Sequence, residues 1–127
     1  MNLFKTEQEI RKEFGENISF LDRKIEHFDV EVVAHFGNIV SPVIFCEDIQ
    51  LIPLYNITHN VGYIIRKIVE LFDASREDGI KLRDFDGTPI RIVIDNHNPY
   101  GGKAIAFGPI DRDRFVITKE LITHDYK

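Results

Sequence analysis

Cysteine is almost missing from this 127-residue chain, and long apolar runs are missing altogether. The single cysteine, Cys46, rules out an internal disulfide framework and suits a reducing compartment. No stretch approaches the roughly 20 consecutive apolar residues that a membrane-spanning helix needs. The first residues, MNLFKTEQEIRKEF, lack the apolar core of a secretory signal. We therefore expect a soluble cytoplasmic protein without a membrane partner.

The short motifs that mark common catalytic and nucleotide-binding sites are also missing. The sequence has no Gly-x-Ser-x-Gly elbow, no His-Glu-x-x-His helix and no glycine-rich phosphate loop with the usual spacing. Its five histidines show no metal-ligand spacing with one another or with Cys46. We therefore expect no metal, no resident cofactor and no enzymatic activity. A small enzyme that uses Asp95 and His97 is the alternative left open, because these two form a close acid–histidine pair.

Positive charge is scarce in the N-terminal half. The net charge is −5, and residues 1–58 hold 5 Lys or Arg against 10 Asp or Glu, whereas residues 59–127 hold 11 of each. Because binding to a phosphate backbone depends on clustered positive charge, we expect no direct contact with nucleic acid. The acidic N-terminal half is the expected contact surface for a partner protein.

What the chain does have is enough apolar material for one folded domain over residues 1–127, with 43% apolar residues and ten phenylalanines. The strongest local pattern is a helix over Val61–Phe72, where apolar residues recur at i, i+3, i+4 and i+7 and Asn60 can cap the start. A shorter helical pattern covers Leu3–Phe14, with Thr6 as the N-cap, Glu9 at capping-box spacing and Gly15 as the stop.

Alternating or apolar stretches predict the strands. They are residues 17–28, 28–36, 43–46, 90–94, 103–107 before a break at Gly108-Pro109, and 115–117, followed by a frayed end at Leu121 and Ile122. The strand at 43–46 is expected either to begin after Pro42 or to lie at a sheet edge. The expected fold class is α+β: a mostly antiparallel sheet of five or six strands packed against one central amphipathic helix, plus a short N-terminal helix. The exposed edge of a strand such as 28–36 makes a homodimer an expectation as well.

The stretch from Asp95 to Lys103 is the candidate binding site. Asn96–Gly102 is dense in turn-forming residues between two strands, so a plain hairpin loop is the simplest interpretation. If the loop borders a pocket, its aromatic, basic and glycine residues suit a planar anionic ligand. The candidate ligand-binding residues are Arg91, His97, Tyr100, Gly101, Gly102 and Lys103. Arg91 can instead cover the second face of its strand or pair with an acid from 111–113.

Three segments of the second half, GYIIRKIVELFD, DFDGTPIRIVID and KAIAFGPIDRDRFV, carry a resemblance. The pattern resembles small proteins encoded by phages and prophages, in which an IR-x-x-(L/V)-E-L-F helix precedes a (L/F)-x-G-x-P-(I/V)-R-V strand and an AIGH-x-x-x-D-(R/K)-(F/W) hairpin. The match covers residues 61–117 and departs at Gly108-Pro109, where the family carries Gly-His. The resemblance implies an accessory viral protein that acts by binding, in the cytoplasm of a host cell.

Two hypotheses about a binding function follow, in addition to the hypothesis of an enzyme that uses Asp95 and His97. The first is a non-enzymatic binding protein that blocks a host defence protein by occupying it, with the acidic N-terminal half as the contact. The second is a small-ligand binder that sequesters an anionic, nucleotide-type signal at the Asp95–Lys103 loop.

Overall fold

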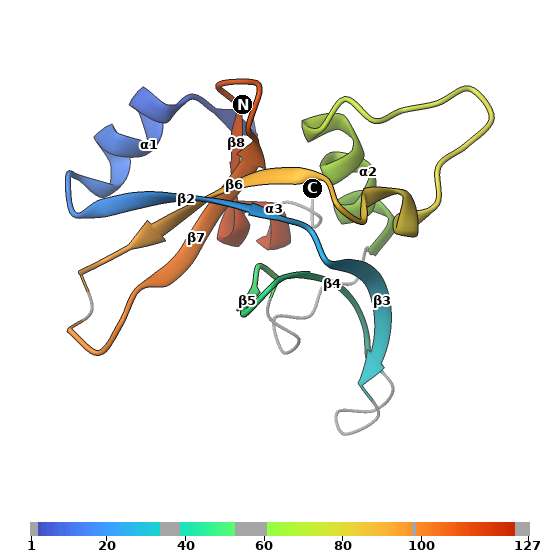
Figure 1. Ribbon diagram of the computed structural model, residues 1–127, viewed down its shortest axis with the longest axis horizontal. Coiled ribbons are helices and arrows are strands. Elements are labelled where there is room, and N and C mark those ends of the chain that lie inside the picture. Colours follow the sequence, from blue (N-terminus) through green and yellow to red (C-terminus); the bar gives the residue numbers. More distant parts are fainter. Residues whose placement is uncertain (1–2, 34–38, 53–60, 98, 124–127) are drawn as a thin grey trace.

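The computed structural model describes residues 3–33, 39–52, 61–97 and 99–123 (Figure 1). The fold is α+β, as expected, with an antiparallel five-stranded sheet in the order β1-β8-β7-β6-β2 and a separate three-stranded sheet in the order β3-β4-β5. The elements are β1 (Phe4–Lys5), α1 (Glu7–Phe14), β2 (Ile18–Lys24), β3 (His27–Val33), β4 (Ile39–Cys46), β5 (Ile49–Gln50), α2 (Val61–Leu71), η2 (Leu82–Phe85), β6 (Pro89–Asp95), β7 (Lys103–Pro109), β8 (Phe115–Ile117) and α3 (Thr118–Thr123).

Strand β6 lies inside the larger sheet and is buried on both faces. Its isoleucines, Ile90, Ile92 and Ile94, point into the cluster that holds α2, as their period-2 spacing predicts. Val93 points the opposite way, into a second cluster with Ile10 of α1. One face of the larger sheet therefore packs in a cluster with α2, α3 and the smaller sheet, and the other face packs on α1, which the sequence pattern did not indicate.

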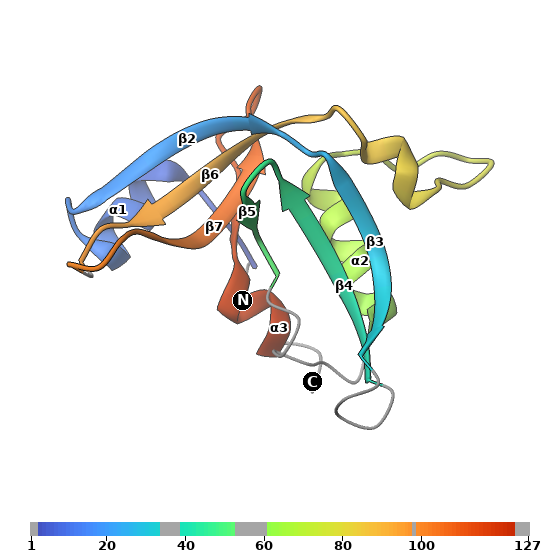
Figure 2. The ribbon, with the colours of Figure 1, turned by 60° about the horizontal axis from the view of Figure 1, so that its bottom comes forward.

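The predicted strands do not form one sheet, because the chain changes sheets between β2 and β3 (Figure 2). Strand β2 pairs with β6 from Ile18 to Lys24. At the junction the Ile25 N–H donates to the Thr88 carbonyl and the Glu26 N–H donates to the Phe45 carbonyl, both at 2.9 Å. The fully buried side chain of Ile25 fixes this bend, from which β3 continues with β4 as a new partner.

Strand β4 runs through Pro42, so the expectation that the strand begins after the proline was wrong. The Ile44 carbonyl accepts from the Leu51 N–H at 2.9 Å, so Ile44 turns its backbone polar groups away from β3. Pro42, two residues earlier, faces the same side, where β5 pairs only with Phe45 and Cys46. Among the described strands none pairs with β4 at Pro42 on this side, so this part of β4 is a sheet edge, in accord with the second alternative.

The N-terminal helix has the ends that the sequence predicts. The Thr6 hydroxyl accepts from the Glu9 N–H, and the Glu9 carboxylate accepts from the Thr6 N–H at 3.0 Å, which completes a capping box. Gly15 ends the helix with a φ of 82°, a conformation that a side chain disfavours. The proposed cap of α2, Asn60, lies outside the described residues.

Three local predictions were wrong. Gly108 and Pro109 do not break a strand but belong to β7, opposite Arg91 and Ile90 of β6. The C-terminal residues are not frayed: Leu121 and Ile122 belong to α3 and are buried in the main cluster. A two-residue strand, β1, precedes α1 and pairs with β8. These short elements exist because tertiary partners hold them, and not because of local propensity.

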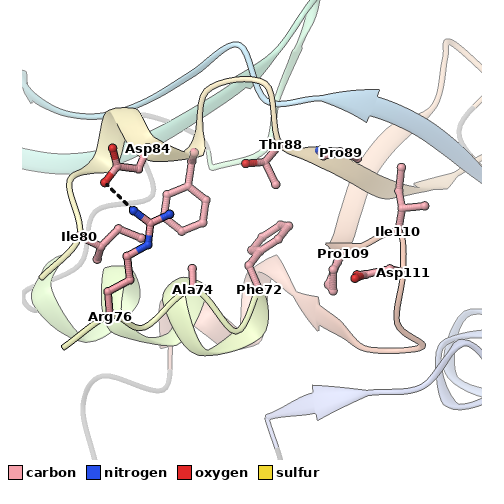
Figure 3. A pocket seen from close by; sticks show the side chains of 11 residues that line it. Phe72, Ala74, Arg76, Ile80, Asp84, Thr88, Pro89, Pro109, Ile110 and Asp111 are labelled. Carbon is pink, nitrogen blue, oxygen red and sulfur yellow. Dashed lines mark ion pairs between the residues drawn. The ribbon is translucent and has the colours of Figure 1, made fainter. Parts of the chain in front are cut away.

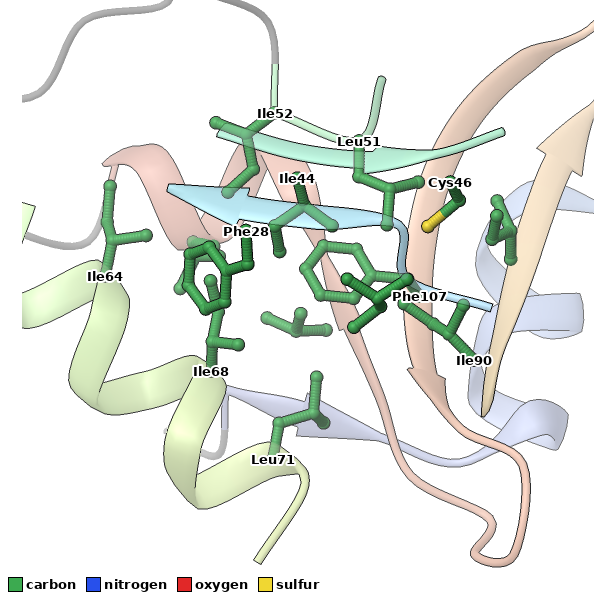
Figure 4. Close-up of a cluster of buried hydrophobic side chains, with 14 of the residues drawn as sticks. Phe28, Ile44, Cys46, Leu51, Ile52, Ile64, Ile68, Leu71, Ile90 and Phe107 are labelled. Carbon is green, nitrogen blue, oxygen red and sulfur yellow. The ribbon is translucent and has the colours of Figure 1, made fainter. Parts of the chain in front are cut away.

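The main core lies between α2, the three-stranded sheet and the inner face of β6 and β7 (Figure 4). Ile64, Ile68 and Leu71 of α2 are fully buried against residues such as Ile44, Ile90 and Phe107. The predicted apolar stripe of the central helix is thereby confirmed. Among the described residues, no helix is long and apolar enough to cross a membrane.

Candidate functional site

The stretch from Asp95 to Lys103 forms the end of a hairpin between β6 and β7, where Lys103 pairs in register with Asp95. The Asp95 carboxylate accepts from the backbone N–H of His97 at 3.0 Å and contacts the His97 ring through Nδ1. These hydrogen bonds hold the pKa of Asp95 below its ordinary value. Tyr100 is 96% exposed at the tip. The structure thus brings together all the candidate ligand residues except Arg91.

Arg91 lies four residues from Asp95 along β6, about 13 Å at the usual rise per residue. Its guanidinium forms a bidentate pair with Asp22 of β2, with Nε–Oδ1 at 2.7 Å and the second nitrogen at 3.0 Å from Oδ2. The two residues are direct cross-strand neighbours. The acid that pairs with Arg91 is therefore Asp22 and not a residue of 111–113. Arg91 is separated from the hairpin loop by most of a strand.

This pair makes a small pH-dependent contribution to stability. Hydrogen bonding from Arg91 lowers the pKa of Asp22 below its ordinary value of 3.8. A depressed carboxyl pKa stabilises the fold above the unfolded pKa, and this stabilisation is lost as the pH falls through the folded pKa. We expect Asp22→Asn to cost less than about 1 kcal/mol at pH 7, because the pair is partly exposed. Urea unfolding of both proteins at pH 7, 4 and 2.5 should show the difference shrinking towards low pH; a constant difference would contradict this origin.

The turn between β7 and β8, residues 110–114, holds the ends of both longer helices. Arg114 donates to the carbonyl oxygens of Glu70 at 3.2 Å and Leu71 at 2.8 Å, at the C-terminal end of α2. Asp113 accepts from the backbone N–H of Glu7, the first residue of α1, at 2.6 Å. Each charge has the sign that the dipole of the helix end favours. The charges of this turn therefore stabilise the ends of both helices.

A groove opens beside this turn, between the loop after α2, η2 and the adjoining ends of β6 and β7 (Figure 3). We call it the loop groove; its volume is about 390 Å³, and apolar side chains including Phe72, Ile80 and Phe85 line it. Arg76 and Asp84 face each other across one part of its rim, with the guanidinium 3.9 Å from the carboxylate. Asp111, from the 110–114 turn, stands at the other end of the groove in Figure 3.

The residues that line the loop groove come from two separate segments of the sequence. The side chain of Phe85 is only 2% exposed and anchors its loop to the core. No local motif connects Arg76 with Asp111, which lie 35 positions apart and line the same groove only because of the sheet topology. The groove could not have been located from the spacing of residues in the sequence.

The smaller sheet carries a strong charge bias. From residue 25 to residue 65 the chain has no Lys or Arg but five acids, all on the smaller sheet or at its start: Glu26, Asp29, Glu31, Glu47 and Asp48. Arg23, at the end of β2, approaches Glu47 at 3.6 Å and offsets one of them. Part of the acidity of the N-terminal half therefore concentrates on this sheet.

The described histidines and the cysteine form no reactive cluster. Among the residues that the structure describes, no group of three or more His, Cys, Asp or Glu side chains is arranged to hold a metal ion; His35, His59 and His124 lie outside these residues. Cys46 is fully buried, and burial, followed by the nearby charges of Glu26 and Glu47, raises its pKa to about 12. Its sulfur is therefore a protonated thiol at neutral pH.

Comparison of the chain with protein-family models, with curated proteins and with solved structures found no match.

Proposed function

We propose that the chain is a non-enzymatic binding protein that acts by occupying a partner protein through its three-stranded sheet. The observation that carries this proposal is the charge bias of that sheet: five acids and no Lys or Arg over residues 25–65. Potentials of one sign steer and select partners of the opposite sign. The resemblance to phage-encoded proteins makes a host-cell protein with a basic surface the partner to seek.

The exposed end of the β3–β4 hairpin adds an apolar contact to this charge. Val32 and Val40 are cross-strand neighbours and are 63% and 40% exposed. They continue the face that begins with the buried Phe28, whereas Asp29 and Glu31 point to the opposite face by strand alternation. A partner that contacts both faces of the hairpin would bind apolar side chains on one face and carboxylates on the other. Interfaces combine apolar contact with complementary charge in this way.

Capture from host-cell extract tests the proposal with a matched pair of variants. Asp29→Asn/Glu31→Gln removes two negative charges from β3, and Glu13→Gln/Glu16→Gln removes two from the end of α1. We expect the native protein and the α1 variant to retain the same protein at low salt, and the β3 variant to retain much less of it. The retained protein is then purified and titrated calorimetrically against all three proteins.

Two results would contradict the proposal. One is that no protein is retained by the native chain over a blank matrix at low salt. The other is that the purified partner binds the β3 and α1 variants equally, since this would show that the acidic side chains of β3 do not contribute to the interface. Sedimentation of the chain alone shows whether a second copy of the chain covers the hairpin instead.

The second candidate function, sequestration of an anionic nucleotide, is supported by the 96% exposure of Tyr100 beside the basic and glycine residues of the hairpin loop. An exposed aromatic ring can stack on a base. A thermal-shift screen of mono-, di- and cyclic nucleotides should then show stabilisation that Tyr100→Ala abolishes. At 100 times the dissociation constant the expected gain is about 2.7 kcal/mol. The absence of any shift would eliminate this candidate.

A further inference from the structure

We propose that the loop groove binds the guanidinium group of an arginine side chain from the partner protein. This inference rests on the proposed function, because it names the chemistry that one contact of the basic partner would supply. It concerns a second surface, formed by the loop after α2, η2 and the 110–114 turn. This surface adjoins the acidic sheet, since Phe85 of η2 packs edge-to-face on Phe28 of β3 with 5.2 Å between ring centroids.

The charges of the groove favour a cation. Two carboxylates, Asp84 and Asp111, line it against one guanidinium, that of Arg76. Within the described part of the chain, Asp111 forms no ion pair, so it is open to a charged ligand. A cation between these carboxylates would be attracted by both, and the net charge of −5 on the chain adds to this attraction.

The chain's own Arg76 places a guanidinium at the rim of the groove. Arg76 extends from the loop after α2 and ends beside Asp84 at the rim (Figure 3). Its pair with Asp84 is long, at 3.9 Å, and the Arg76 side chain is 60% exposed. Such an exposed pair is weak. An incoming guanidinium can therefore replace Arg76 on Asp84 at little cost, while the displaced side chain returns to water.

The aromatic wall of the groove suits an arginine. Phe72 is partly exposed there and meets the buried Phe85 edge-to-face, with 5.7 Å between ring centroids, so Phe72 is the ring open to a ligand. Arginine packs on phenylalanine faces by cation–π contact and buries its apolar stem at the same time. Elsewhere in this chain Arg11 lies 4.8 Å from the ring centre of Phe20, and Arg114 lies 5.5 Å from that of Phe4. Lysine, with a compact and strongly hydrated ammonium, is a poorer match.

The test is a titration of the intact ¹⁵N-labelled chain, followed by NMR, with N-acetyl-argininamide. N-acetyl-norleucinamide serves as the neutral probe and N-acetyl-lysinamide as the ammonium probe. We expect saturable shifts of the amides of Phe72, Phe85 and Asp111 with the arginine probe, weaker binding of the lysine probe and no saturation with the neutral probe. Linear shifts with all three probes, or equal binding of all three, would overturn the proposal.

Variants separate the groove from general charge effects. Arg76→Ala should tighten binding of the arginine probe, and Asp84→Asn or Asp111→Asn should weaken it, each by about two- to fivefold, the range that exposed ion pairs give. Arg83→Ala makes the same charge change as Arg76→Ala at an exposed site in η2 outside the groove, and it should leave the affinity within about 1.5-fold. In the native chain the backbone N–H of Lys81 donates to the Asp84 carboxylate at 2.9 Å. The side-chain oxygen of asparagine can accept this hydrogen bond as well, so Asp84→Asn should keep the local fold.

The same variants distinguish failure of this inference from failure of the proposed function. The partner captured through the acidic sheet is titrated against Asp84→Asn/Asp111→Asn. A weaker complex supports the groove as part of the interface. Unchanged affinity would show that the groove does not bind the partner, and the proposal that the acidic sheet binds it would be unaffected.

Discussion

Replacing Gly108 by alanine should destabilise the protein by more than about 3 kcal/mol, at or beyond the upper end of ordinary overpacking. A Cβ atom at this position would lie 1.9 Å from the carbonyl oxygen of Arg114 and 2.9 Å from its carbonyl carbon. Both are backbone atoms of the segment that leads into β8, so neither can rotate away. Relief requires β7 and the 110–114 turn to separate. Urea unfolding followed by circular dichroism measures the loss.

Gly102→Ala is the matched control, because the same methyl group is added in the same hairpin. There the Cβ would lie 2.3 Å from Cγ2 of Ile94, a side-chain atom near the loop end of the hairpin, and 3.1 Å from Oδ1 of Asn96. These are side-chain atoms, which can adjust more easily than the backbone of Arg114, so we expect a loss of about 1–2 kcal/mol. Equal losses for the two variants would show that the approach of the turn to Gly108 is not a tight backbone contact.

Arg114→Ala should lower the free energy of unfolding by about 2–3 kcal/mol, the second largest effect. The substitution removes two charge-assisted hydrogen bonds to the last carbonyls of α2, of the kind that contribute about 1.5–3 kcal/mol, and a cation at a helix C-terminus. It also removes the contact of the guanidinium with the ring of Phe4. Arg114→Lys keeps the charge but not the planar guanidinium that packs on the ring of Phe4, and it should recover less than half of the loss. Thermal and urea unfolding measure both variants.

Arg112→Ala provides the comparison within the same turn. Arg112 pairs with Asp73 at 3.1 Å, and the side chains are 41% and 68% exposed. Exposed pairs of this kind contribute between 0 and about 1 kcal/mol. If Arg112→Ala and Arg114→Ala destabilise the protein equally, the cap on α2 is not what makes Arg114 important.

The elements that could be predicted are those that their own residues specify. The capping box of Thr6 and Glu9, the apolar stripe of α2 and the alternation of β6 depend on interactions within a few residues, and each is found in the structure. The short elements β1 and α3 could not be predicted, because they are held by β8 and by the main core. The division into two sheets was also missed, because the bend at Ile25 depends on hydrogen bonds to residues far along the chain.

The candidate site could be predicted only in part, for the same reason. The hairpin loop was located correctly because Asn, Pro and Gly specify turns locally. Arg91 was grouped with that loop, and its actual partner, Asp22, follows from the register of β2 against β6. The loop groove draws residues from positions 72–89 and 109–111. Bringing these two segments together requires the strand order, which no sequence pattern here provides.

The most direct test of the account is the affinity of the captured partner for three proteins at the same ionic strength: the native chain, Asp29→Asn/Glu31→Gln and Glu13→Gln/Glu16→Gln. We predict that removing two charges from β3 weakens the complex several-fold and lowers its salt dependence, whereas removing two charges at the C-terminal end of α1 leaves both unchanged. Equal affinities for all three proteins would contradict the claim that this chain acts by presenting an acidic sheet to a basic partner.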